Sequence, residues 1–369
     1  MTALGALERL VVTRCTALQW APGNVAQMQG LRELRLDGCR TVLLPPSLAC
    51  LGRLERLIVV SNGCSGSGVG AGVEVGIGGE VGEGMGVDAD GNMNGGSSSG
   101  SGHGPTDPPS ATHEPFSSFL PSTPLALPPG MGQLAQLREL EVSGFDSLSA
   151  LPPSLASLSR LTRLCLTGSL KLASLPDLPC GAVAAGSGSG CCGYASSSSS
   201  SAIAPSSTAP NGSFFLHLTN LRDLQLDSCL SLASLPASLS SLSSLNRLHL
   251  AFCSSLSALP PRLSSLSHLR SLNLQECISL TSLPPSLSSL VRLEGLYLKG
   301  CIQLKSLPCD IGYLPRLREL DLRDCEGLLA LPGSITLLTG LKWLDIFGCS
   351  SLDKDSVPAR IGQATIYRS

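Results

Sequence analysis

The chain has 369 residues, of which 43% are hydrophobic, 4% aromatic and 14% charged, and its net charge is −2. A typical soluble domain carries about 25% charged residues, so the core must be built mainly from small aliphatic side chains, and the charge gives no reason to expect nucleic acid as a partner. No apolar run is long enough for membrane insertion, and charges at Glu8, Arg9 and Arg14 exclude a secretory signal peptide.

A repeating unit begins near the N-terminus and continues through most of the chain. Its pattern, LxxLxLxxCxxLxxLPxxLxxLxx, mostly recurs every 24 residues. The LxLxx part alternates with the period of a β-strand, and LxxLPxxLxxL has the period of a turn followed by a short helix or 3-10 segment. Proline fits a helix start, and it stands there at positions such as Pro260, Pro261, Pro284 and Pro285. The eleven units begin at Leu7, Leu31, Leu54, Leu137, Leu161, Leu221, Leu245, Leu269, Leu293, Leu317 and Leu341.

These features predict a leucine-rich-repeat solenoid of the α/β class. One unit cannot bury its leucines alone, whereas stacked units share a continuous core. We expect a horseshoe with a concave parallel β-sheet and short helical or 3-10 segments on its convex side. Two disordered insertions of linker composition interrupt it, and because the repeat resumes in register after each, the sheet should stay unbroken. The expected organisation is 1–62, repeats 1–3; 63–123, a Gly/Ser/Pro-rich insertion; 124–176, repeats 4–5; 177–213, a Ser/Gly-rich insertion; 214–352, repeats 6–11; and 353–369, a C-terminal tail.

Cysteine occupies the ninth position of eight units. One thiol per coil predicts a stacked ladder, in which each buried S–H caps a backbone carbonyl. A metal site would need clustered ligands with histidine partners, so we expect neither a metal nor another cofactor. Without a signal peptide the thiols should stay reduced, which favours a cytoplasmic location. The eight are Cys15, Cys39, Cys229, Cys253, Cys277, Cys301, Cys325 and Cys349.

The third position of the unit alternates in charge along the first seven strands. Neighbouring strands therefore offer opposite charges side by side, which favours cross-strand ion pairs that fix the strand order. A ligand-reading surface is the alternative interpretation. The alternating residues are Arg9, Glu33, Arg56, Glu139, Arg163, Asp223 and Arg247.

The C-terminal strands carry a different set of outward residues, rich in aromatic side chains. Exposed aromatic residues beside arginine are typical of interface hot spots, so we expect a protein partner to bind this part of the concave face. The alternative is that Trp343 and Phe347 shield the C-terminal end of the core. The candidate partner-binding residues are His249, Phe252, Tyr297, Asp321, Arg323, Trp343, Asp345 and Phe347.

No catalytic residues are predicted. The chain has no HExxH, GxSxG or kinase-like motif, and its five histidines are scattered. We therefore expect a non-catalytic interaction scaffold. Because the first unit begins almost at Met1, its core edge should be bare, and self-association through this N-terminal edge is a further hypothesis.

Two stretches carry a family resemblance, CSSLSALPPRLSSLSHLRSLNL and CIQLKSLPCDIGYLPRLRELDL. They resemble the repeats of plant intracellular nucleotide-binding disease-resistance proteins and are similar to those of Ras-interacting leucine-rich-repeat scaffolds. This resemblance implies a role in signal transduction or defence response. The segment that begins Cys349-Ser-Ser-Leu-Asp looks similar to repeats of ubiquitin-ligase substrate receptors, which makes substrate recognition in a ubiquitin ligase complex the alternative function.

Overall fold

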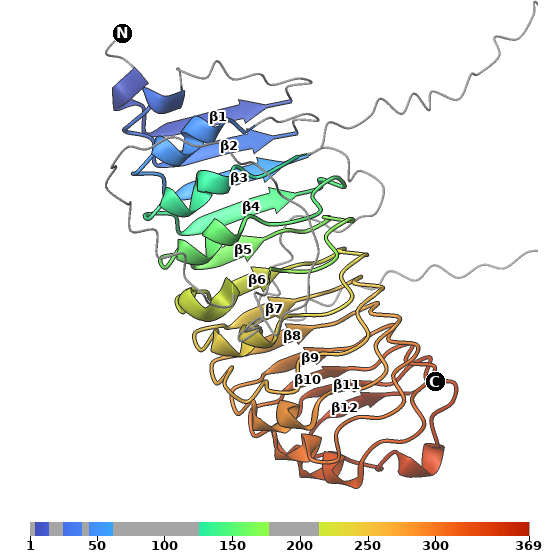
Figure 1. Cartoon of the computed structure of the whole chain (residues 1–369). Coiled ribbons are helices and arrows are strands. Elements are labelled where there is room, and N and C mark those ends of the chain that lie inside the picture. Colours follow the sequence, from blue (N-terminus) through green and yellow to red (C-terminus); the bar gives the residue numbers. More distant parts are fainter. Residues whose placement is uncertain (1–3, 15–24, 39–43, 62–124, 177–213, 369) are drawn as a thin grey trace, which may run out of the picture. The chain divides into compact units, whose positions relative to one another are not determined.

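The repeats form one parallel β-sheet whose strands follow each other in chain order (Figure 1). The computed structural model describes residues 4–14, 25–38, 44–61, 125–176 and 214–368. The two insertions predicted to be disordered lie outside these ranges. The strands are β1 (Arg9–Thr13), β2 (Glu33–Asp37), β3 (Arg56–Val60), β4 (Glu139–Ser143), β5 (Arg163–Cys165), β6 (Asp223–Gln225), β7 (Arg247–His249), β8 (Ser271–Asn273), β9 (Gly295–Tyr297), β10 (Glu319–Asp321), β11 (Trp343–Asp345) and β12 (Thr365–Tyr367).

The predicted register is confirmed throughout the sheet. Third-position residues pair with third-position residues, as in Arg247 with Ser271 and Glu319 with Trp343. The pairing also continues across both insertions, because β3 pairs with β4 and β5 pairs with β6. The sheet is therefore unbroken, and residues at one position of the unit form a line across the strands.

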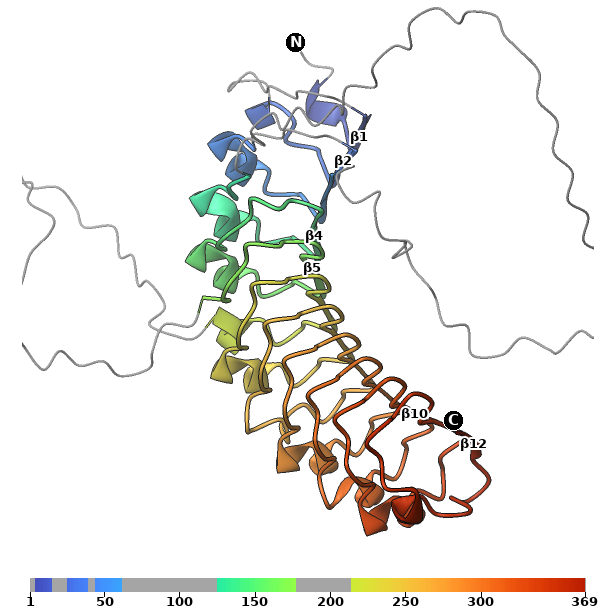
Figure 2. The ribbon, with the colours of Figure 1, turned by 90° about the vertical axis from the view of Figure 1, so that its right-hand side faces the viewer.

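Short 3-10 segments lie on the side of the stack opposite the strands (Figure 2). Several follow a proline whose carbonyl accepts the first turn hydrogen bond, as in Leu155 N–H to Pro152 O at 3.1 Å. Extended backbone at the proline gives way to a single tight turn. The segments are η1 (Leu4–Ala6), η2 (Pro46–Cys50), η4 (Pro129–Gln133), η5 (Pro153–Ser157), η6 (Phe214–His217), η7 (Ala237–Ser241), η8 (Pro285–Ser289), η9 (Ile311–Tyr313), η10 (Gly333–Leu337) and η11 (Lys354–Ser356).

The helix start predicted at Pro260 and Pro261 is wrong. No 3-10 segment forms there, although Pro285 of the next coil begins η8 as expected. The reason is a competing hydrogen bond from the neighbouring coil. The Leu263 N–H donates to Ser286 Oγ at 3.1 Å, and that hydroxyl donates to Pro261 O at 2.7 Å.

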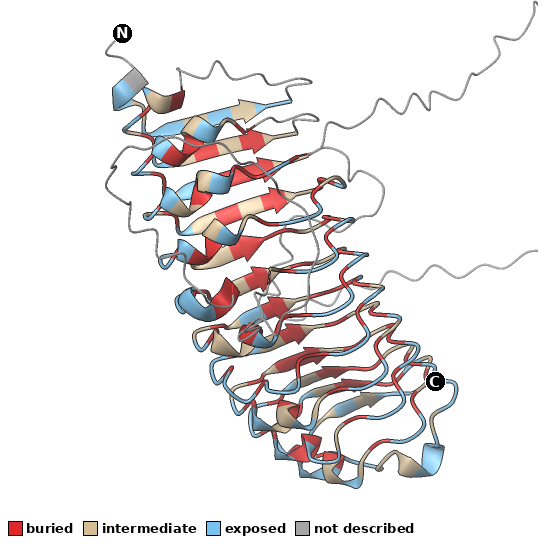
Figure 3. Ribbon diagram, in the orientation of Figure 1, coloured by how far each residue is buried: buried red, intermediate tan, exposed pale blue. Residues whose placement is uncertain are grey.

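Buried leucines form layers between the strands and the 3-10 segments. Figure 3 marks the buried residues along the ribbon in red. Leucines at the fourth and sixth positions of the unit point inward. Leu272 in β8 and Leu274, the first residue after β8, are both fully buried. The buried apolar residues of successive coils belong to one hydrophobic cluster. Leu7, Leu10 and Val12 of the first coil pack against this cluster but are only partly buried. The chain is thus a leucine-rich-repeat solenoid.

The segment 353–369, expected to be a tail, adds a further coil to the stack. Asp353 caps η11 by accepting the Asp355 N–H at 3.1 Å, and Ile361 is buried. The following strand β12 then pairs with β11 through Trp343 and Thr365. The sheet consequently has one strand more than the eleven units recognised in the sequence.

The cysteine ladder is confirmed for the six ninth-position cysteines that the structure describes. Each thiol donates to the carbonyl of the sixth-position leucine of the preceding coil, as in Cys253 Sγ to Leu226 O at 3.2 Å and Cys325 Sγ to Leu298 O at 3.1 Å. Burial raises the pKa of the Cys253 and Cys325 thiols to about 12, so they remain protonated donors at neutral pH. Cys15 and Cys39 lie outside the described residues.

Ser169 occupies the ladder position of the fifth coil, and its fully buried hydroxyl has no hydrogen-bond partner among the described residues. Replacing Ser169 by cysteine should raise the free energy of unfolding by about 1 kcal/mol, because the larger sulfur completes a missing rung and removes an unsatisfied hydroxyl. Urea denaturation measures the difference. The converse substitution, Cys253→Ser, should lower the stability, and an unchanged midpoint for both variants would contradict the role of the ladder.

Candidate protein-interaction surface

The outward face of β1–β7 is an ion-pair lattice, as its charge alternation predicted. Arg9 lies 3.2 Å from Glu33, and Glu139 lies 3.6 Å from Arg56 and 3.4 Å from Arg163. The arginine side chains of these pairs are 40–65% exposed, so each pair contributes at most about 1 kcal/mol. Each pair joins third-position residues of neighbouring strands.

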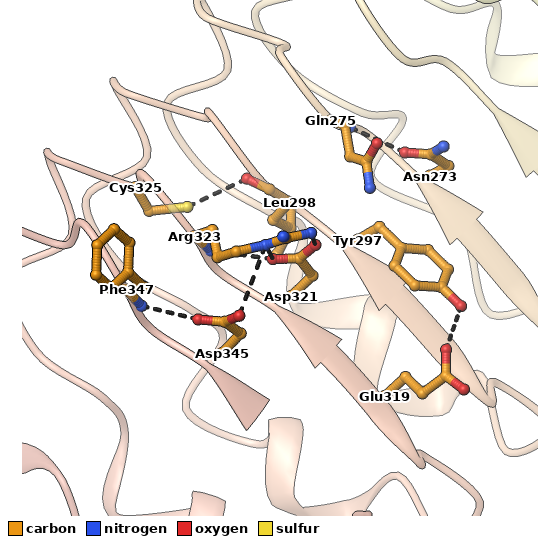
Figure 4. A network of polar contacts seen from close by, with 10 residues as sticks. All are labelled: Asn273, Gln275, Tyr297, Leu298, Glu319, Asp321, Arg323, Cys325, Asp345 and Phe347. Carbon is orange, nitrogen blue, oxygen red and sulfur yellow. Dashed lines mark hydrogen bonds and ion pairs between the residues drawn. The ribbon is translucent and has the colours of Figure 1, made fainter. Parts of the chain in front are cut away.

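A polar cluster replaces this lattice on β10 and β11 (Figure 4). Arg323 binds the Asp321 carboxylate with two side-chain hydrogen bonds, Nε to Oδ1 at 3.0 Å and Nη2 to Oδ2 at 2.7 Å. Its Nε also lies 3.7 Å from Asp345 Oδ2. Asp345 Oδ1 accepts the Phe347 N–H at 3.0 Å. One guanidinium therefore holds two carboxylates that face each other across the strand pair.

The expectation that Asp321 and Asp345 project into solvent is wrong. They are only 1% and 8% exposed, because the Arg323 side chain bonds to both of them on the face of the sheet. The two aspartates therefore orient the Arg323 side chain on the face of the sheet.

Trp343, the first residue of β11, packs against this cluster. Its ring lies 5.8 Å from the Arg323 guanidinium carbon and meets Tyr367 edge to face, with ring centroids 6.4 Å apart. The alternative that Trp343 shields the end of the core is not what the structure shows, because β12 follows β11 and covers that end. Phe347 and Tyr367 are 57% and 50% exposed, which leaves apolar ring surface at this face.

Tyr297 lies along its own strand rather than outward. A Cβ on Gly295 would come within 2.9 Å of the Tyr297 ring, so only glycine leaves room for the ring in this position. The Tyr297 hydroxyl donates to Glu319 Oε2 at 2.5 Å. Burial, followed by the neighbouring Glu319 carboxylate, raises the pKa of the phenol. Tyr297 is half-buried and is thus partly a structural residue.

His249 stands apart from this cluster, because β8 and β9 separate its strand from β10. Its Nε2 is buried without a hydrogen-bond partner among the described residues. Burial lowers the pKa of His249, and the Asp227 carboxylate opposes that effect. The eight candidate residues therefore do not form one site.

Phe252 occupies a backbone position that large side chains rarely adopt. The eighth residue of the unit turns the chain after the strand with positive φ in most described coils, often as glycine, as in Gly144 and Gly348. Phe252 has φ 61° and is 39% exposed, so it combines an uncommon backbone conformation with an exposed ring. Arg14, Ser228, Glu276 and Asp324 share this positive φ at the same position of their units, so the turn belongs to the repeat, whereas an exposed aromatic ring on it is particular to Phe252.

The sequence places Gly295 and Glu319 at the outward third position of their units, but neither they nor Tyr367 were among the predicted partner-binding residues. Tyr367 was missed because β12 lacks the LxxLxL signature. The glycine at a strand position usually occupied by larger residues was a signal of close packing that could have identified Gly295. Among the described residues, no helix is long and apolar enough to cross a membrane, and no three His, Cys, Asp or Glu side chains are grouped to hold a metal ion.

Comparison with known proteins finds no matching family model and no matching curated protein. Solved structures do match. A leucine-rich-repeat protein of Leptospira interrogans is 19% identical, with a TM-score of 0.42 over 96% of this chain and 81% of that chain. The leucine-rich-repeat domain of the type III effector XopL is 26% identical, with a TM-score of 0.39 over 62% of this chain and 75% of that one. An internalin of Listeria monocytogenes is 12% identical, with a TM-score of 0.48 over 99% and 83%.

Proposed function

We propose that the chain binds a protein partner on the outward sheet face of β7–β12. The observation that carries this proposal is the set of aromatic side chains held exposed there, above all Phe252 with its positive φ and Phe347 with 57% exposure. Exposed aromatic residues beside an ordered arginine are the composition of interface hot spots. A solenoid that offers an ordered face also loses little conformational entropy on binding.

The test compares two double variants in affinity purification from an extract of the source cells, with quantitative mass spectrometry. Phe252→Ala/Phe347→Ala should reduce recovery of the partner at least tenfold, because it removes the two exposed rings without disturbing the core. Tyr313→Ala/Leu337→Ala is the matched control, since these side chains are 65% and 51% exposed on η9 and η10. Equal recovery by both variants would contradict the proposal.

The cytoplasm is the location we propose for this binding. The support comes from the thiol ladder, in which each cysteine uses its S–H as a hydrogen-bond donor, as Cys277 does to Leu250 O at 3.2 Å. Donation requires reduced thiols, which persist in a reducing compartment. A signalling or defence role rests on the repeat resemblance alone, and recovery of a small GTPase or a resistance-type nucleotide-binding protein would favour it.

The alternative is substrate recognition in a ubiquitin ligase complex. Its support is the turn after Cys349, where the Asp353 carboxylate caps η11. Co-purification of a Skp-type adaptor would favour this alternative.

Self-association is a separate proposal. Its support is the first coil, whose Leu7, Leu10 and Val12 are only partly buried against the described core. Light scattering of the purified chain distinguishes a dimer, which would support the proposal, from a monomer, which would contradict it.

A further inference from the structure

The charge of the outward face differs between the two halves of the sheet. We count the third, fifth, seventh and eighth positions of each unit, which form the strand face and the turn that follows it. On β1–β7, six arginines face six carboxylates. On β8–β12, five carboxylates, from Glu276, Glu319, Asp321, Asp324 and Asp345, face only Lys299 and Arg323. At these counted positions the second half therefore carries a net charge of −3, and the second positions of its units, at the strand starts, add Arg270, Glu294, Arg318 and Lys342.

The buried carboxylates in this half have too little positive charge beside them. Asp321 and Asp345 are direct partners on adjacent strands, where like charges repel. They share one guanidinium, and the Asp345 Oδ2 contact to it is long, at 3.7 Å. Among the described residues, Glu276 and Asp324 have no ion-pair partner. A further cation at this face would relieve that imbalance.

Three aromatic rings lie beside one of these carboxylates, and two of them, Phe347 and Tyr367, are exposed. Trp343, Phe347 and Tyr367 lie beside Asp345, and Arg323 already lies within cation–π distance of Trp343. A guanidinium or ammonium group of a partner can bind in the same way, with a carboxylate on one side and an aromatic face on the other. We name the five carboxylates, Glu276, Glu319, Asp321, Asp324 and Asp345, together with the three rings, Trp343, Phe347 and Tyr367, the acidic–aromatic patch.

We propose that the acidic–aromatic patch docks an arginine- or lysine-bearing segment of the protein partner. The inference rests on the proposed binding function of this face and specifies the chemistry of its partner. Besides Lys299 and Arg323, positive groups of the chain lie at the strand starts, in a cleft lined by Arg316, Arg318 and Lys342 with Glu294. Of the five carboxylates, Glu319 begins its strand, whereas the others lie at strand ends or in the turns that follow.

A random-peptide phage library panned on the purified full chain provides the probe, and fluorescence anisotropy then measures the enriched peptides. We expect peptides with an excess of arginine and lysine. Glu276→Gln/Glu319→Gln/Asp324→Asn should weaken their binding at least tenfold, because it removes three charges while keeping side-chain shape. Raising the salt from 0.1 M to 1 M should also weaken binding, since the Debye length falls from about 10 Å to about 3 Å.

Glu33→Gln/Glu139→Gln/Asp223→Asn is the matched control, because it makes the same change in net charge on the other half of the face. Its affinity should stay within twofold of the original chain. Enrichment of acidic or uncharged peptides, or equal loss of affinity in both triple variants, would overturn the inference.

The proposed function has its own readout in the same experiment. If the enriched peptides bind Trp343→Ala/Phe347→Ala as tightly as the original chain, this face is not the binding surface, and both proposals fail. If that variant loses binding while the charge variant keeps it, the binding face stands and only the preference for a cation is wrong.

Discussion

Arg323→Ala is expected to lower the free energy of unfolding by about 3 kcal/mol. Removing the arginine leaves Asp321 and Asp345, which are 1% and 8% exposed, facing each other without a cation. Breaking a buried ion pair by deleting one partner typically costs about 3–5 kcal/mol. We expect the lower end, because the Arg323 side chain is itself 38% exposed and water replaces part of its contribution. Urea denaturation followed by circular dichroism measures the loss.

Two further variants separate this effect from a simple loss of packing. Adding Asp321→Asn and Asp345→Asn to Arg323→Ala should recover most of the stability, because the uncompensated charges are gone. Arg247→Ala is the matched control, since Arg247 pairs with Asp223 at 3.5 Å with a side chain that is 62% exposed, and it should cost at most about 1 kcal/mol. Equal losses for Arg323→Ala and Arg247→Ala would show that the two aspartates do not depend on Arg323.

Leu272→Ala should destabilise the solenoid by about 2–5 kcal/mol. Leu272 is fully buried in β8. Replacing it by alanine loses the transfer free energy of the removed carbon atoms and leaves a cavity, because the neighbouring coils cannot collapse to fill the space. In a repeat stack each coil is stabilised by its neighbours, so the loss weakens the interfaces to β7 and β9 together.

Leu329→Ala is the control for this prediction, because the same substitution at a side chain that is 58% exposed should change stability by less than about 0.5 kcal/mol. Chemical denaturation of the two variants in parallel provides the comparison. Losses of similar size would mean that the leucine layers do not carry the stability of the stack.

Most of the fold could be predicted because the unit repeats its chemistry at fixed spacing. The LxxLxL pattern predicted the strands and their register, and the ninth-position cysteines predicted the hydrogen-bond ladder that Cys253 and Cys325 now show. The exceptions arise where hydrogen bonds from a neighbouring coil determine the local structure. Ser286 replaces the expected 3-10 turn after Pro261, and β12 forms by pairing although its residues lack the leucine pattern.

The surface was less predictable than the fold, for a physical reason. The period of two shows that Asp321 and Asp345 lie on the outward face, but exposure also depends on neighbouring side chains. Arg323, from the turn after β10, bonds to both carboxylates, and Tyr297 lies back over Gly295. Such contacts depend on side-chain length and rotamer, which the spacing of residues in one sequence does not specify. The charge alternation was predictable because it needs only the register.

The pairing of β3 with β4 has a consequence for cooperativity. Arg56 pairs with a residue 83 positions later, whereas Glu139 pairs with one only 24 positions later. The entropy of closing a loop grows with the logarithm of its length, so joining β3 to β4 costs about 1 kcal/mol more than joining β4 to β5. β5 and β6 meet the same kind of cost with only three residue pairs, since Arg163 pairs with a residue 60 positions later. Packing between neighbouring coils therefore has to offset this cost at both junctions for the stack to unfold as one unit.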